Sequence, residues 1–318
     1  MENKWRIILE DFLNILNQLD KNKKIQLPMK TYSYKYWSEQ LQDYKKKNFE
    51  KEKDYWNSIL NRDWVYPADF NNKQDNTKNI SVLNSELDGT TTCDLIKKTN
   101  DIYSLEFKEV LIVALALTIN NITNNHEVII ELEGHGREAI AENVDISRTV
   151  GWFTTIYLAY FKIEHTELDK NIKSLKEQIR DIPDKGFNYG ILRFLNHEFK
   201  KSDRKYIRFN YLGDFDNIID KEKLNVYNIE FGLDNDKRNS MSSLMDIEVM
   251  IVNRKLNISI TYSNTRFKNE TIQTFINKYM ETLQLILDHC ISKSFKEFTP
   301  SDFNTVDISQ EDIDSLFN

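Results

Sequence analysis

Glu131-Leu-Glu-Gly-His-Gly-Arg-Glu138 is the stretch of this chain that packs glycines and ionisable groups most densely, and Asp145-Ile-Ser-Arg-Thr-Val-Gly-Trp-Phe-Thr154 follows it closely. A strand is predicted from residue 128 into this stretch. Gly134 and Gly136 then flank His135, and glycine lets a backbone take conformations that other residues avoid, so that it can approach a ligand closely. We therefore expect the strand to end in a turn that presents charged side chains.

Six ionisable side chains crowd this segment and make it the first candidate for a functional site. They are Glu133, His135, Arg137, Glu138, Asp145 and Arg148. A carboxylate held beside fixed cations is one way in which proteins tune a general base. The segment therefore predicts acid–base chemistry at the end of the strand.

Strands and helices alternate beyond residue 80, which predicts an α/β sandwich. Residues 256–262 show the clearest strand pattern, because apolar side chains at every second position alternate with polar ones, so that one face is buried. Further strands are predicted at residues 80–87, 128–133, 155–163, 206–212, 226–231 and 244–252. Helices are predicted at residues 92–101, 105–122, 167–180, 185–194 and 270–291.

The amino-terminal region differs, because it contains helical patterns without an obvious strand. An apolar stripe predicts a helix from Trp5 to Leu19, and aromatic-rich segments at residues 32–41 and 49–60 also read as helical. A polar stretch at residues 67–78 is a plausible boundary loop. We therefore predict a boundary between residues 1–64 and the region of alternating strands and helices that follows.

Bulk composition indicates a cytoplasmic protein with a sizeable core. The 318 residues are 40% hydrophobic, enough for one large domain or two lobes. The net charge of −7 argues against nucleic acid as a partner. The longest apolar run, Val110 to Leu117, is too short to span a membrane. Cys93 and Cys290 lack metal-ligand spacing and suit a reducing compartment, and no metal, nucleotide or flavin motif is present.

Several sequence blocks resemble the epimerization domains of nonribosomal peptide synthetases, a branch of the condensation-domain superfamily. They are the two glycine-rich blocks above, Pro183-Asp-Lys-Gly-Phe-Asn-Tyr-Gly-Ile-Leu-Arg-Phe-Leu195, Phe209-Asn-Tyr-Leu-Gly213, Trp5-Arg-Ile-Ile-Leu-Glu-Asp-Phe12 and Phe298-Thr-Pro-Ser-Asp-Phe303. The blocks occur in the family's order, which is more specific than any single motif. The resemblance implies a fold of two lobes, each like chloramphenicol acetyltransferase, with the active site in a tunnel between them. Residues 65–292 would be the second lobe, residues 1–64 a helical remnant of the first, and residues 293–318 a linker tail.

The resemblance also implies a reaction, the inversion from L to D of the α-carbon of a carrier-tethered aminoacyl or peptidyl thioester. Such a site needs a base, an acid and a donor for the enolate oxygen. Glu133 matches the family's catalytic glutamate and is predicted to transfer one proton. The alternative is a strand-end carboxylate that is paired with Arg137 or Arg148.

A second set of residues is predicted to line the substrate channel or to support it. His135 could act as a base or only hydrogen-bond the turn, and an ion-pair scaffold is expected from Arg137, Asp145 and Arg148. The full set is His135, Arg137, Asp145, Ser147, Arg148, Trp152, Tyr189, Asn210 and Tyr211. One departure is Leu158, where the family usually has proline.

The family's HHxxxDG motif, whose second histidine is its other proposed proton-transfer group, is absent. The five histidines include no adjacent pair. We expect the carboxyl-terminal part of an epimerization domain, cut just downstream of this motif and inactive by itself. Its expected partners are a peptidyl carrier protein with a phosphopantetheine arm and, where the chain is one piece of a split synthetase, an upstream polypeptide carrying the first lobe. No cofactor of its own is expected.

Two alternatives stay open at this point. The chain could be a catalytically dead fragment that only binds a carrier protein or a synthetase. It could also belong to a condensation-type transferase that makes an amide bond, although the residues of the two glycine-rich blocks resemble the epimerizing branch more.

Overall fold

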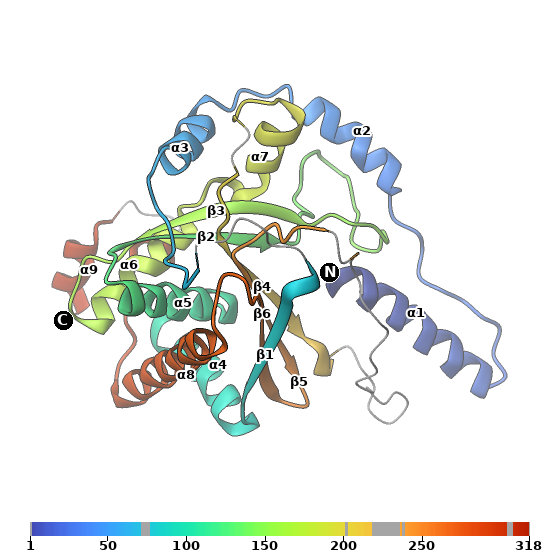
Figure 1. The fold of residues 1–318 in the computed structure, drawn as a ribbon. Helices are drawn as coiled ribbons and strands as arrows, with labels where there is room; N and C mark the ends of the chain where they lie inside the picture. The colour runs from blue at the N-terminus through green and yellow to red at the C-terminus, as the bar shows by residue number, and fades with distance from the viewer. Residues whose placement is uncertain are drawn as a thin grey trace.

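One six-stranded sheet organises the described part of the chain, which in a computed structural model comprises residues 2–70, 77–200, 203–217, 236, 239–303 and 308–317 (Figure 1). The strand order is β1-β6-β5-β4-β2-β3. The β2/β4 and β4/β5 pairs are parallel, and the other neighbours are antiparallel. The strands are β1 Ile80–Leu87, β2 Glu127–Gly134, β3 Thr155–Lys162, β4 Ile207–Asp214, β5 Met245–Val252 and β6 Lys255–Ser263.

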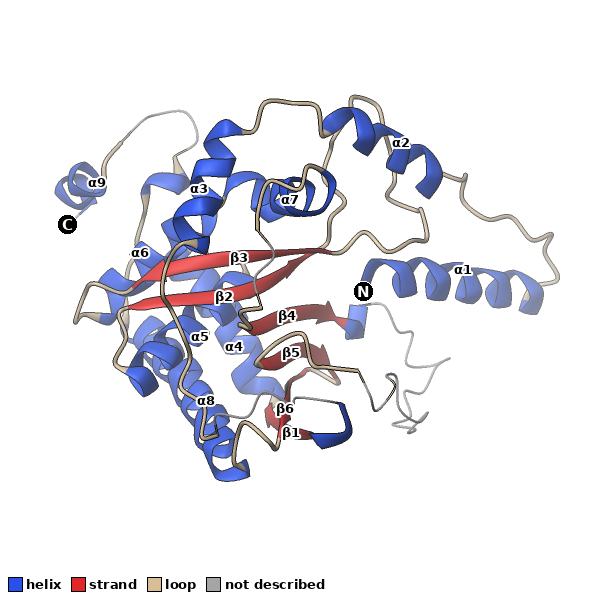
Figure 2. Cartoon of the chain, turned by 45° about the horizontal axis from the view of Figure 1, so that its top comes forward, coloured by secondary structure: helices blue, strands red, loops and turns tan. Residues whose placement is uncertain are grey.

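Helices cover the apolar face of this sheet (Figures 1 and 2). They are α4 Gly89–Tyr103, α5 Phe107–Thr123, α6 Leu168–Arg180 and α8 Asn269–Ser292. The stretch Val110 to Ala116 of α5 is buried at every residue, because this helix packs between β2 on one side and α6 and α8 on the others. Strand β6 alternates buried and partly exposed residues, as its sequence pattern predicts.

On the opposite face of the sheet, the described helices pack over β3. They are α3 Glu50–Leu60 and the short helix α7 Phe187–Gly190, which continues into a π-helical turn at Ile191–Leu195. Trp56 of α3 is fully buried, and its indole N–H donates to Oδ1 of Asn188 at 3.1 Å. Helix α2, Tyr34–Tyr44, lies beside α7 and places Trp37 edge-on against Phe153. The division of the chain into a first-lobe remnant and a second lobe remains a prediction.

Helix α1, Glu2–Asp20, extends away from the sheet (Figures 1 and 2). Arg148 binds it through ion pairs with Glu10 and Asp11. Ile7 and Leu13 are buried, whereas large apolar side chains elsewhere on α1 are exposed, namely Ile8, Phe12 and Leu19.

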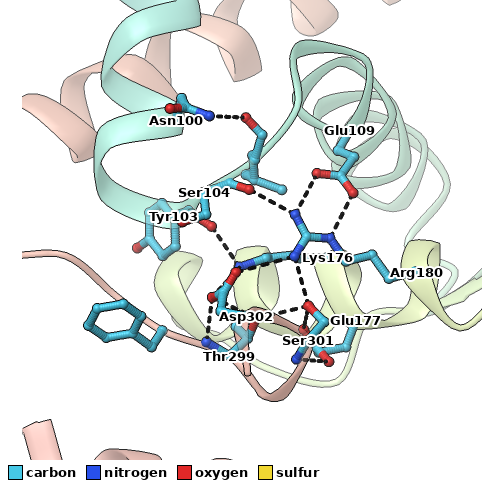
Figure 3. A network of polar contacts seen from close by, with 12 residues as sticks. Asn100, Tyr103, Ser104, Glu109, Lys176, Glu177, Arg180, Thr299, Ser301 and Asp302 are labelled. Carbon is cyan, nitrogen blue, oxygen red and sulfur yellow. Dashed lines mark hydrogen bonds and ion pairs between the residues drawn. The ribbon is translucent and has the colours of Figure 1, made fainter. Parts of the chain in front are cut away.

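The segment after α8 packs back on the helical layer (Figure 3). It contains the 3₁₀ turn Pro300–Asp302 and the helix α9 Gln310–Phe317. Lys176 of α6 is fully buried and pairs with Asp302 at 2.6 Å. Arg180 of α6 contacts both Glu109 of α5 and Asp302, so this segment is fixed to two helices.

The fold class predicted from the sequence is confirmed, and the predicted strands and helices within the described residues are present, except that the helix predicted at residues 185–194 is divided among a 3₁₀ turn, α7 and a π-helical turn. The strand predicted at residues 226–231 lies outside the described residues. Helix α9 and the π-helical turn were not predicted. In the part of the chain that the structure describes, no helix has the length and apolar character needed to cross a membrane.

Candidate functional site

Glu133 stands near the carboxyl end of β2 and is held through both its side chain and its backbone. Its Oε2 accepts a hydrogen bond from Nδ2 of Asn210 on β4 at 2.8 Å. Its carbonyl oxygen accepts one from Nζ of Lys108, in the first turn of α5, at 2.7 Å. The side chain is partly buried. Three elements therefore meet at this residue.

The surroundings of Glu133 favour its protonated form. Burial raises the pKa of this carboxyl, and the positive charge of Arg208 opposes that rise. The negative charges of Glu248 and Asp246 raise the pKa further. A carboxylate whose pKa lies nearer neutrality is a stronger base, so this environment suits proton transfer.

A row of charged side chains crosses the sheet beside Glu133. Glu131 of β2 accepts a hydrogen bond from Nε of Arg208 of β4 at 2.7 Å, and Nη1 of Arg208 lies 3.7 Å from Oδ1 of Asp246 of β5. These residues are opposite one another in the register of the three strands. Burial alone would lower the pKa of Arg208, but the negative charges of Glu131 and Asp246 raise it, so Arg208 carries its positive charge.

The turn after β2 depends on Gly136. Its φ is +65°, and a Cβ at this position would lie 1.6 Å from the carbonyl oxygen of Phe153. Only glycine permits this close approach, which brings the loop back against the start of β3. Gly136 therefore serves the turn directly.

His135 points out of the turn and is about half exposed. Its Nδ1 accepts the backbone N–H of Arg137 at 2.9 Å, and its Nε2 lies 3.4 Å from Oε1 of Glu138. A neutral ring that accepts at Nδ1 carries its proton on Nε2. Partial burial lowers the pKa of His135, Glu138 opposes this, and Lys108, Lys185 and Arg137 lower it further.

The two arginines of the loop contact other partners than Glu133. Arg137 donates to the carbonyls of Ile146 and Thr149 and lies over the ring of Phe153 at 4.1 Å. Arg148 binds α1. The structure thus does not pair Glu133 with either arginine, which was the alternative reading of this carboxylate.

The other predicted site residues are spread over the loop, the strands and α7. Oδ1 of Asp145 accepts the N–H of Ser147 at 2.8 Å, which closes a local turn. Tyr211 of β4 contacts Phe107 edge-on, with ring centroids 5.6 Å apart. Tyr189 is almost fully buried, and its hydroxyl accepts from Nη1 of Arg193 at 2.9 Å.

A groove of about 990 Å³ runs along the partly covered face of the sheet. Its lining includes Glu131 and Arg208, an aromatic group, and Leu158. The aromatic group consists of Tyr34, Trp37, Trp152, Phe153, Phe187, Tyr189, Phe194, Phe199 and Tyr206. Glu133 and Asn210 follow Glu131 and Arg208 by two residues on the same faces of β2 and β4, next to the groove and outside its lining.

Sequence reasoning missed Lys108, Glu131 and Arg208. Arg208 and Glu131 were detectable as charged residues on the polar side of predicted strands. Lys108 gave no such signal, because its contact with β2 arises only from tertiary packing. Among the described residues, no cluster of three or more potential metal ligands occurs.

Comparison with known proteins gives one family. The model described as Condensation domain matches residues 4–309. Surfactin synthase subunit 1 of Bacillus subtilis (strain 168) is 34% identical over 321 residues, which cover 98% of this chain and 9% of that protein. Gramicidin S synthase 1 of Brevibacillus brevis is 34% identical over 337 residues, which cover 99% of this chain and 30% of that protein. The chain therefore spans less than a third of the length of these relatives.

Solved structures agree with this match. The epimerization domain from the third module of tyrocidine synthetase B superposes with a TM-score of 0.83 at 32% identity, covering 92% of this chain and 68% of that one. SgcC5 protein from Streptomyces globisporus superposes with a TM-score of 0.66 at 12% identity, covering 90% of this chain and 66% of that one. The second likeness concerns the fold alone.

Proposed function

The chain belongs to the condensation-domain family, and from this membership we propose that it supplies part of an epimerization site of a nonribosomal peptide synthetase. The substrate would be an aminoacyl or peptidyl thioester on the phosphopantetheine arm of a peptidyl carrier protein in the cytoplasm. The observation that carries the proposal is Glu133, a partly buried carboxylate with a raised pKa that is oriented by Asn210 and that forms no ion pair with an arginine among the described residues. The superposition on an epimerization domain supports it.

The proposed role of Glu133 is proton transfer on one face of the substrate. Its carboxylate would take the α-proton, the electron pair would move into the thioester carbonyl as an enolate, and a proton would return to the α-carbon from the opposite face. Asn210 fixes the carboxylate for this step through its hydrogen bond to Oε2. Remaining site residues, His135, Arg137 and Arg148 among them, would hold the loop beside the channel rather than transfer protons.

The second proton-transfer group is proposed to come from outside these 318 residues. The sequence contains no adjacent pair of histidines and so no copy of the HHxxxDG motif. An enzyme that inverts a carbon centre through two groups loses inversion when one is absent. We therefore expect no inversion by this polypeptide alone and inversion when a second polypeptide supplies the HHxxxDG lobe.

The test is chiral analysis of a loaded carrier protein. A carrier bearing an L-aminoacyl thioester is incubated with the chain alone, or with the chain and a polypeptide that bears the HHxxxDG lobe, and the released amino acid is separated by chiral chromatography. We expect D-isomer only in the second reaction. Glu133→Gln should lower its rate roughly 10²- to 10⁴-fold, the usual worth of general acid–base catalysis. Glu127→Gln, at the other end of β2, is the matched control and should retain the rate.

Each other outcome points to a different reading. D-isomer from the chain alone would show that a second polypeptide is not needed. An amide product would favour a condensation-type transferase. Binding of the loaded carrier without any turnover in either reaction would favour a catalytically dead binding fragment and contradict the proposal.

A further inference from the structure

Lys108 is a charged residue that the proposed reaction has not yet used. It is the second residue of α5, and its side chain is partly buried. Its Nζ donates to the carbonyl oxygen of Glu133 at 2.7 Å. Among the described residues, the structure gives this ammonium no ion pair with a carboxylate. The contact to the backbone of Glu133 is therefore its principal anchor.

This placement is unfavourable for a lysine in isolation. The amino-terminal end of a helix carries a partial positive charge, which disfavours a cation in the first turn. Burial also lowers the pKa of Lys108, although Glu133 and Glu106 oppose that effect. A cation that is retained against both costs needs a compensating contact, and the end of β2 provides it.

The first turn of α5 is itself held rigidly, so Lys108 projects from a fixed base. Glu109 accepts the backbone N–H of Glu106 at 2.8 Å and closes a capping box. Arg180 binds both carboxylate oxygens of Glu109, at 2.9 and 3.1 Å (Figure 3). The neighbouring Phe107 contacts Tyr211, so the same turn reaches the ends of both β2 and β4.

We propose that Lys108 is a positioning residue of the candidate site, whose ammonium fixes the end of β2 so that the carboxylate of Glu133 meets Asn210. The structural part of this proposal is independent of the reaction, and its catalytic consequence rests on the proposed function. When the backbone carbonyl of Glu133 is held in place, the direction in which the Glu133 side chain leaves the strand is fixed as well. Without that anchor, the hydrogen bond from Asn210 would form in only a fraction of molecules.

The structural test compares variants of the full chain by NMR and hydrogen exchange. Lys108→Met keeps the length of the side chain and removes the charge and the donor, whereas Lys108→Arg keeps both. In Lys108→Met, ¹³C NMR of the labelled carboxyl should show the pKa of Glu133 moved further upward, because a nearby cation is lost and the hydrogen bond from Asn210 to the carboxylate forms in fewer molecules. Amides of the peptide around residues 131–136 should exchange about tenfold faster, the effect expected of one lost hydrogen bond to a charged group.

Lys176→Met is the matched control, since Lys176 is also a buried lysine that donates to a backbone carbonyl, that of Tyr103. It should weaken the fold as a whole and leave the pKa of Glu133 in place. An unchanged Glu133 pKa and unchanged local exchange in Lys108→Met would overturn the proposal. If Lys108→Met fails to fold, Lys108→Gln replaces it under the same criteria.

The catalytic test uses the two-polypeptide assay, in which the chain is mixed with a polypeptide that bears the HHxxxDG lobe. Lys108→Met should lower kcat up to about 100-fold with little change in KM, because a small misplacement of a reacting group acts on the transition state. Lys108→Arg should restore most of the loss. NMR changes without inversion in any variant, wild type included, would defeat the proposed function and leave the positioning role intact. Inversion that is equally fast in Lys108→Met would defeat the positioning role alone.

Discussion

At the residue scale, two neighbours of Glu133, one on β4 and one on β5, shift its protonation in opposite directions. Asn210 donates to its carboxylate and so favours the ionised form, whereas the negative charge of Glu248 disfavours it. These two residues face each other across β4 and β5. Substitution of one neighbour should therefore raise the pKa of Glu133, and substitution of the other should lower it.

Substitutions at these two positions should shift the pH profile in opposite directions. Asn210→Ala removes a hydrogen bond to the ionised form, raises the pKa of Glu133 and moves the acidic limb of the kcat/KM profile to higher pH. Glu248→Gln removes a negative charge, lowers that pKa and moves the limb to lower pH. Profiles between about pH 4 and 9 in the two-polypeptide assay measure both shifts. Shifts of the same sign would show that Glu133 is not the group that titrates.

The sequence predicted individual residues of this site but not the contacts between them. Resemblance pointed to Glu133 and Asn210 as separate members of two blocks. Their hydrogen bond depends on the parallel pairing of β2 with β4, which joins residues 77 positions apart and leaves no local signal. Lys108 was missed for the same reason, because nothing in the pattern of α5 indicates which strand end its side chain reaches.

At the element scale, the buried ion pair between Lys176 and Asp302 fixes the segment after α8 to α6. Lys176 is fully buried, and the side chain of Asp302 is 10% exposed. Burial alone would raise the pKa of Asp302, but its bonds to Lys176 and to the N–H of Thr299, together with the charge of Arg180, lower it. The pair therefore contributes stability that depends on pH.

Asp302→Asn should reduce the free energy of unfolding at neutral pH by about 3–5 kcal/mol, the usual cost of breaking a buried pair. A lowered carboxyl pKa stabilises the fold above the unfolded value near 3.9, and this stability is lost as pH falls through the folded value. The difference between wild type and variant should therefore shrink in acid, as measured by urea unfolding from pH 7 down to about pH 2. Asp312→Asn is the control, because Asp312 also has a lowered pKa but is exposed. A difference that is constant with pH would contradict the assignment.

Periodicity was sufficient to predict most helices and strands, and it was insufficient where tertiary contacts set the backbone. Residues 185–194 read as one short helix, yet the chain breaks before Phe187. Gly186 has a φ of +83°, and a Cβ there would lie 2.1 Å from the ring of Tyr157 on β3. The break is therefore imposed by packing against the sheet, which no local pattern reveals.

At the scale of the whole molecule, four helices cover one face of the sheet, and the described helices on the other face pack over β3 (Figure 2). The alternation at residues 256–262 predicted one buried and one exposed face for that strand. The order β1-β6-β5-β4-β2-β3 was not predictable from the chain, because it places the sixth strand between the first and the fifth. The pairs β2/β3, β4/β5 and β5/β6 join strands that are consecutive in the chain, and the β5–β6 hairpin turns tightly at Asn253 and Arg254.

The last prediction concerns helix α1, because only some of its apolar side chains are buried. Ile7 and Leu13 are buried, but Ile8, Phe12 and Leu19 are 42%, 47% and 52% exposed and recur at helical spacing on one face. Contiguous exposed apolar side chains favour association or dye binding. We expect this chain to bind a hydrophobic fluorescent dye and to elute earlier from size exclusion as its concentration rises. Phe12→Ser combined with Leu19→Ser should reduce both effects, whereas Leu285→Ser, at a separate exposed position on α8, should not. A monomeric, dye-silent wild type would show that this face of α1 is satisfied within the chain.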